Sequence, residues 1–236
     1  MTHIPSSGAP HLPTGVYIAQ GYFNNLEGVH KFGYNSAVGT AYETIWDGGG
    51  VYSFPTAATT AVVTSASGAT DSGVEVYIEG LDANYEKQSE TVTLNASGTF
   101  TTTNTYIRLH RAYVAGDTAA DGDITITVNS LTVAKVLSAY QQTEMLVYTV
   151  PAGYRGYLLQ VDASVQKEKE IVVKIMTRQD GGVFLVKGIL SSFASPVHRK
   201  FDLPMMLPEK TDIRIDAKAG ATTEIAGEFE VVLEKL

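Results

Sequence analysis

The chain has 236 residues, of which 44% are apolar and 18% charged, and it carries a formal net charge of −8 and no cysteine. This composition is that of a folded protein with one large or two small domains, and it excludes disulfide scaffolds, thiolate metal sites and cysteine nucleophiles. Because only five Lys and Arg residues precede residue 141, the charge also argues against a nucleic-acid partner.

The first 30 residues predict an extended N-terminal arm. Pro5, Pro10 and Pro13 lie among glycines and small polar residues, which fit neither a helix nor a strand. We expect the arm to become ordered by contact with a neighbouring subunit, through a short apolar island. The residues of this island are Val16, Tyr17, Ile18, Tyr22 and Phe23. An ordinary first strand is the alternative. The arm lacks the features of a secretory signal, and no stretch of the chain approaches the roughly 18 apolar residues of a membrane helix.

From residue 42 onward, apolar and polar residues alternate in short runs. Examples are 74–79, 124–128, 171–175, 213–216 and 228–234. A period of two places one set of side chains in a core and the other in water, as in a β-strand. Residues that favour turns separate the runs, and Asp180-Gly181 is the clearest hairpin. The sequence therefore predicts an all-β fold, an antiparallel β-sandwich or jelly roll.

The composition changes near residue 140. Residues 1–140 hold 12 acidic and 5 basic side chains, and residues 141–236 hold 13 and 12. Of the 26 threonines, 20 lie in the first part. We predict an arm over 1–30, a Thr/Gly-rich β subdomain over 31–140 and a C-terminal β-sandwich over 141–236. A single large jelly roll over 31–236 is the alternative.

The residue types that carry chemistry form no catalytic motif. The five histidines are not spaced as metal ligands, and no serine lies in a G-x-S-x-G elbow. Asp117, Asp121 and Asp123 place three carboxylates in one loop, but their spacing is not that of a helix–loop–helix calcium site, and a turn explains them as well. We expect no enzymatic activity, no cofactor and no metal, and leave a cation at this loop open.

Seven segments occur in an order that points to a family: 31–35 (KFGYN), 43–49 (ETIWDGG), 76–85 (VYIEGLDANY), 89–95 (SETVTLN), 108–114 (RLHRAYV), 122–126 (GDITI) and 148–153 (YTVPAG). In this combination they resemble the small structural proteins of tailed bacteriophages, especially those of marine and cyanobacterial hosts. The segment 207–213 (LPEKTDI) resembles a recurrent strand entry in such proteins. No catalytic residues accompany the resemblance.

The resemblance implies a β-rich component of the virion that is assembled in the host bacterial cytoplasm. We expect a capsid decoration (cement) protein that braces the outer surface of an icosahedral shell. Its expected partners are the major capsid protein, contacted by the apolar island, and copies of itself, with a homotrimer favoured. The alternative is a tail, fibre or baseplate accessory protein that binds a host glycan on an aromatic platform of Trp46, Tyr52 and Tyr85.

Overall fold

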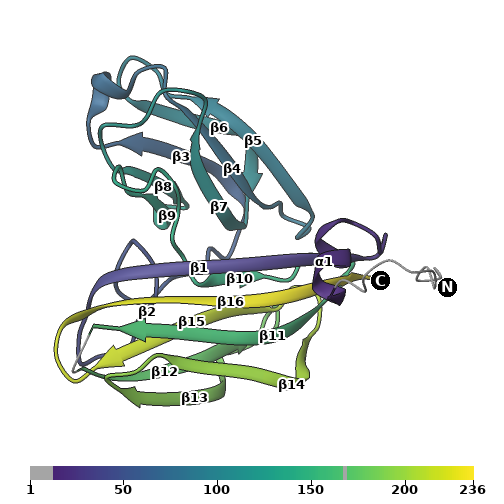
Figure 1. Ribbon diagram of the computed structural model, residues 1–236. Helices are drawn as coiled ribbons and strands as arrows, with labels where there is room; N and C mark the ends of the chain where they lie inside the picture. Colours follow the sequence, from purple (N-terminus) through teal and green to yellow (C-terminus); the bar gives the residue numbers. More distant parts are fainter. Residues whose placement is uncertain (1–12, 167–168) are drawn as a thin grey trace.

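A computed structural model describes residues 13–166 and 169–236, and this part of the chain consists almost entirely of antiparallel strands (Figure 1). The elements are α1 (Thr14–Ala19), β1 (Leu26–Val38), β2 (Glu43–Thr44), β3 (Thr59–Ser65), the 3₁₀ turn η1 (Gly68–Asp71), β4 (Glu75–Leu81), β5 (Lys87–Thr93), β6 (Thr99–Tyr106), β7 (Arg108–Ala115), β8 (Ile124–Val128), β9 (Leu131–Val136), β10 (Val147–Thr149), β11 (Tyr154–Val165), β12 (Glu170–Arg178), β13 (Leu185–Phe193), β14 (Val197–Leu207), β15 (Asp212–Ala219) and β16 (Thr223–Lys235). The predicted all-β fold is confirmed.

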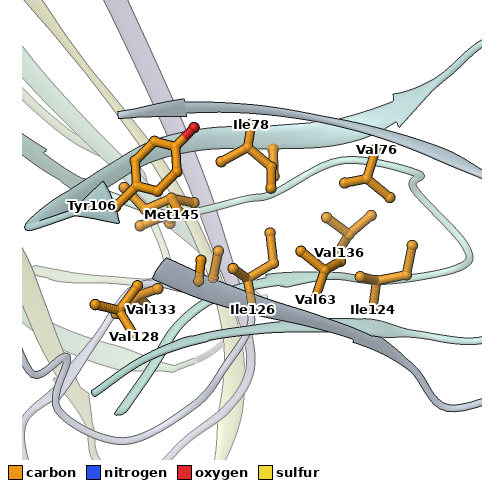
Figure 2. Packing of buried hydrophobic residues seen from close by; sticks show 14 of the residues in the cluster. Val63, Val76, Ile78, Tyr106, Ile124, Ile126, Val128, Val133, Val136 and Met145 are labelled. Carbon is orange, nitrogen blue, oxygen red and sulfur yellow. The ribbon is translucent and has the colours of Figure 1, made fainter. Parts of the chain in front are cut away.

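Strands β3–β9 form an upper sandwich, drawn at the top of Figure 1. One sheet has the order β6-β3-β8-β9 and the other the order β5-β4-β7. Figure 2 shows how the core forms: Val76 and Ile78 of β4 face Val63 of β3 and Ile126 of β8 across the gap between the sheets. These residues occupy alternate positions of their strands, so the period of two in the sequence supplies the core.

The other strands form a lower sandwich. One sheet has the order β1-β16-β11-β14, and the second has the order β10-β15-β12-β13, with β2 added to β15. Its buried core is built from side chains that the two sheets turn toward each other, such as Val161 of β11, Ile175 of β12 and Phe229 of β16. The predicted hairpin at Asp180-Gly181 is confirmed, since β12 and β13 pair antiparallel and Gly181 has a positive φ of 71°.

The chain enters the lower sandwich first, builds the upper one and then returns. β1 pairs with β16 along most of its length, from Leu26 opposite Glu234 to Val38 opposite Thr223. Residues 26–44, which the sequence assigned partly to the arm and partly to the first subdomain, therefore lie in sheets shared with C-terminal strands. Strand pairing so distant along the chain leaves no local sequence signal. The predicted boundary near residue 140 falls between β9 and β10.

The predicted arm differs from the structure in its second half. The residues Thr14–Ala19 form the single turn α1, and residues 26–30 belong to β1. A helix of six residues is too short to show a 3.6-residue period, so the sequence pattern missed it. The prolines Pro5 and Pro10 lie outside the described residues.

A buried ion pair between Arg108 and Asp212 joins the two sandwiches. Arg108 at the start of β7 donates from Nε to Oδ1 of Asp212 at 2.7 Å and from Nη2 to Oδ2 at 3.1 Å. Arg178 of β12 donates from Nε to Oδ2 of the same carboxylate at 3.0 Å, and the Thr149 hydroxyl donates to Oδ1 at 2.6 Å. Asp212 is 1% exposed, and its carboxylate is held by the guanidinium groups of Arg108 and Arg178.

Candidate interaction surface

One sheet of the lower sandwich ends at β13 and the other ends at β14, and these two strands follow each other in the chain. β13 pairs only with β12, and β14 pairs only with β11, so each strand has one edge without a β-partner in the described part of the chain. Such an edge presents a row of backbone N–H and C=O groups that can pair with another strand. We call residues 183–207, which contain both strands, the open edge.

The open edge carries most of the exposed large apolar side chains of the described residues. Seven of twelve such side chains lie there, and they are Val183, Leu185, Val186, Ile189, Phe193, Leu203 and Met206. Their exposure ranges from 46% for Val186 to 88% for Leu203. Isolated exposed apolar residues are ordinary, but a patch on the order of several hundred Å² marks an interaction site.

A shallow apolar groove lies at one end of the open edge. It has a volume of about 380 Å³ and runs between the beginning of β13 and the end of β14. Leu185 lies on one side, and Met205 and Met206 lie on the other. Met205 packs partly against the lower core, whereas Met206 is 57% exposed. Methionines adapt their shape to a partner, which suits a contact surface.

The two edge strands differ in how well they resist pairing. β13 carries one charged residue, Lys187, in nine. β14 carries Arg199, Lys200, Asp202 and Pro204, which are the residue types that usually prevent edge-to-edge association. β13 is therefore the edge that is open to a further strand.

The apolar island predicted as a contact site is gathered at one place on the surface. Val16, Tyr17 and Ile18 lie in α1, which packs beside β1. The rings of Tyr17 and Tyr22 are 5.5 Å apart, and Phe23 meets Tyr22 edge-on at 5.5 Å. A groove of about 680 Å³ separates α1 from β1 and β16. The structure thus brings the five residues together, and their role in contacting a coat protein stays a prediction.

The prediction that Trp46, Tyr52 and Tyr85 form an exposed platform for a glycan is wrong. Trp46, Tyr52 and Tyr85 are 5%, 2% and 6% exposed. Trp46 and Tyr52 pack edge to face at 5.0 Å in the upper core, and the Tyr52 hydroxyl donates to the Val133 carbonyl at 3.0 Å. These rings therefore serve packing, since buried aromatic side chains with satisfied polar tips stabilise a core.

The carboxylates of Asp117, Asp121 and Asp123 are not gathered around a point that could hold a cation. Asp123 forms an ion pair with Lys135 at 3.2 Å and accepts a hydrogen bond from the Ser138 amide, and these bonds lower the pKa of Asp123. The backbone amide of Asp121 donates to Asp71 at 2.8 Å. Within the described residues, no group of three or more His, Asp or Glu side chains is placed to hold a metal ion.

Asp47 and Glu144 form a partly buried carboxyl pair. The Glu144 amide donates to Oδ2 of Asp47 at 2.5 Å, while Asp47 Oδ1 and Glu144 Oε2 are buried without a partner. Burial raises the pKa of Asp47 from 3.8 to about 8, and the charge of Glu144 adds to the rise. Burial also raises the pKa of Glu144. Burial therefore favours the protonated form of both carboxyl groups in the folded protein.

Comparison with known protein families finds no family model that matches the chain, and no curated protein matches it. Among solved structures, the chain is similar to that of infectious bursal disease virus, Gt strain, at 9% identity and a TM-score of 0.23, over 89% of this chain and 72% of the other. It is also similar to the PBSX exported protein XepA, at 9% identity and 0.21, over 86% of both chains. The VP2 subviral particle of infectious bursal disease virus matches at 8% identity and 0.22, over 90% and 77%. These are weak likenesses, and they assign no family. In the described residues, no helix is long and apolar enough to cross a membrane.

Proposed function

We propose that the protein is a non-enzymatic structural component of a phage particle, a capsid decoration protein that associates with copies of itself. The observation that carries the proposal is the open edge, where seven exposed apolar side chains lie on or beside two edge strands, each with one edge that has no β-partner in the described residues. The segments of the sequence that resemble phage structural proteins support the location in a virion.

A second copy of the chain is the occupant that best fits the open edge. The chain carries a net charge of −8, so two copies repel each other over most of their surface. Residues 183–207 include Lys187, Arg199 and Lys200 but only one acidic residue, Asp202, so this segment attracts an acidic surface of a second copy. Association there removes apolar surface from water and adds strand-to-strand hydrogen bonds. A closed symmetric oligomer agrees with the general preference of homo-oligomers, and the resemblance to phage structural proteins favours a trimer.

The apolar island, which includes three residues of α1, attaches the protein to the shell in this proposal. The island lies on β1, whereas the open edge is formed by β13 and β14. The two surfaces therefore serve different partners, the major capsid protein and a second copy. Deleting residues 1–24 removes the island and leaves β1 whole, so we expect a folded oligomer that no longer co-sediments with capsids. Co-sedimentation equal to that of the full chain would show that the island is not the anchor.

The copy number in purified particles tests the proposed function. A decoration protein covers every face of the shell, so we expect hundreds of copies per particle by gel densitometry against the major capsid protein. A handful of copies would place the protein on the tail, and its absence from particles would contradict the proposal altogether.

A further inference from the structure

A charged side chain is buried between the two sandwiches without a charged partner. Lys31 of β1 is 9% exposed, and its Nζ donates to the main-chain oxygen of His110 in β7. In residues 13–166 and 169–236, this is the hydrogen bond that the ammonium group makes, and no carboxylate oxygen lies within 4 Å of it. An ammonium group has three donors, so two of them lack a protein acceptor there.

The charge of Lys31 is only partly compensated. Burial, with a smaller contribution from the Arg111 guanidinium, lowers its pKa from 10.5 to about 8. The carboxylate of Glu79 acts in the opposite direction. A buried ammonium without a contacting anion is unfavourable, which makes the site receptive to one.

His110 supplies a second donor beside Lys31. Its ring packs against Tyr148 at 4.1 Å between centroids, and its Nε2 accepts a hydrogen bond from the Thr149 amide at 3.3 Å. Burial holds the pKa of His110 well below its usual value, so the ring is neutral and its proton lies on Nδ1. No residue of the described part of the chain accepts a hydrogen bond from this Nδ1.

Lys31 and His110 line a polar cleft of about 440 Å³ between β1, β4 and β7. Thr143 and Tyr148, each 4% exposed, are also buried there. Glu27 lines the cleft but is already engaged by Lys87 and by the Tyr154 hydroxyl. Glu79 also lines the cleft, opposite Arg111 in the pairing of β4 with β7, so Lys31, Lys87 and Arg111 face two carboxylates and leave a net positive charge.

We propose that this cleft binds a small organic carboxylate, whose oxygens accept hydrogen bonds from Lys31 Nζ and His110 Nδ1. A cleft of this size suits a small ligand, and hydrogen bonds from a charged donor to a carboxylate are stronger than those between neutral groups. The inference does not depend on the open edge or on the location of the protein in a particle.

The test uses the full chain with sodium succinate, and with sodium chloride at matched ionic strength. A ligand that binds only the folded state raises the Tm of the protein, and the rise increases with the logarithm of the ligand concentration. We expect succinate to raise the Tm of the wild type more than chloride does, and Lys31→Met to abolish this difference. Lys174→Met, which alters a lysine of β12 outside the cleft, serves as the control and should keep it.

Nuclear magnetic resonance of the wild type supplies a measurement that needs no variant. A bound carboxylate stabilises the charged amine, so the pKa of Lys31 should rise when succinate is added. An unchanged pKa, an equal Tm shift with chloride, or an equal succinate effect in Lys31→Met would each overturn the proposal.

Discussion

Arg108 and Asp212 meet side by side across the junction of the two sandwiches, through hydrogen bonds of 2.7 and 3.1 Å. Both residues are at most 5% exposed. Arg108 also donates from Nη1 to the Pro55 carbonyl at 2.7 Å, so the guanidinium group is fully engaged. A paired and hydrogen-bonded buried charge is tolerated, whereas an orphaned one is costly. Arg108 and Asp212 therefore join the two sandwiches, and replacing either residue leaves a buried charge without its partner.

Replacing Asp212 by Ala should lower the free energy of unfolding by about 3–5 kcal/mol, because two guanidinium groups lose their counter-charge. Urea unfolding at neutral pH measures the effect. Glu27→Ala is the control, since it removes an ion pair to Lys87 that is about half exposed and contributes about 0–1 kcal/mol. Equal losses in the two variants would contradict the structural role of the junction.

Gly80 of β4 lies against the main chain of β7. A Cβ atom at this position would come 2.2 Å from the Arg108 carbonyl oxygen. We expect Gly80→Ala to destabilise the upper sandwich by about 1–3 kcal/mol or more, because backbone atoms must shift. Gly28→Ala in β1 is the matched control, since the nearest atom to its Cβ would be Ile18 Cγ2 at 3.9 Å. Thermal unfolding that ranks Gly28→Ala as the more harmful change would contradict this packing.

The raised pKa of Asp47 makes stability depend on pH with a definite sign. Between its ordinary value of 3.8 and about 8, the folded protein holds a proton that the unfolded chain has released. This contribution to stability is complete below 3.8 and is lost as the pH rises toward 8. Asp47→Asn should remove this dependence, so the variant gains stability relative to the wild type as the pH rises through this window.

Urea midpoints measured at both ends of that pH window check the prediction. Asp117→Asn, in an exposed loop, is the control and should follow the wild type at every pH. A constant difference between Asp47→Asn and the wild type across the window would show that the Asp47 carboxyl is not protonated in the folded state.

The all-β fold was predictable because most strands bury one face, as Val76 and Ile78 of β4 do. The pairing of β1 with β16 was not, because the partners are about 200 residues apart and share no local pattern. Trp46 and Tyr52 were misjudged as exposed because aromatic residues in connecting segments occur both in cores and on binding surfaces.

The sequence of β13 is rich in apolar residues, but it lacks the alternation of apolar and polar residues that indicates a strand with one exposed face. Residues 185–193 read LVKGILSSF, with apolar residues at both odd and even positions. This pattern equally fits a strand buried on both faces. The order of the strands in the sheet leaves β13 with a neighbour on one side only. It also leaves Ile189 and Phe193 59% and 67% exposed. The order is a tertiary property, which the residues of β13 alone do not encode.

Light scattering coupled to size exclusion tests the central claim, that the open edge joins copies of this chain. We expect the wild type to have a mass near three times 25.3 kDa, and Ile189→Lys/Phe193→Lys to run as a 25.3 kDa monomer that keeps the wild-type circular dichroism. Val51→Lys, at a residue that is 52% exposed outside the edge, should match the wild type. A wild type that stays monomeric at every concentration, or a double variant that keeps the oligomer, would contradict the account.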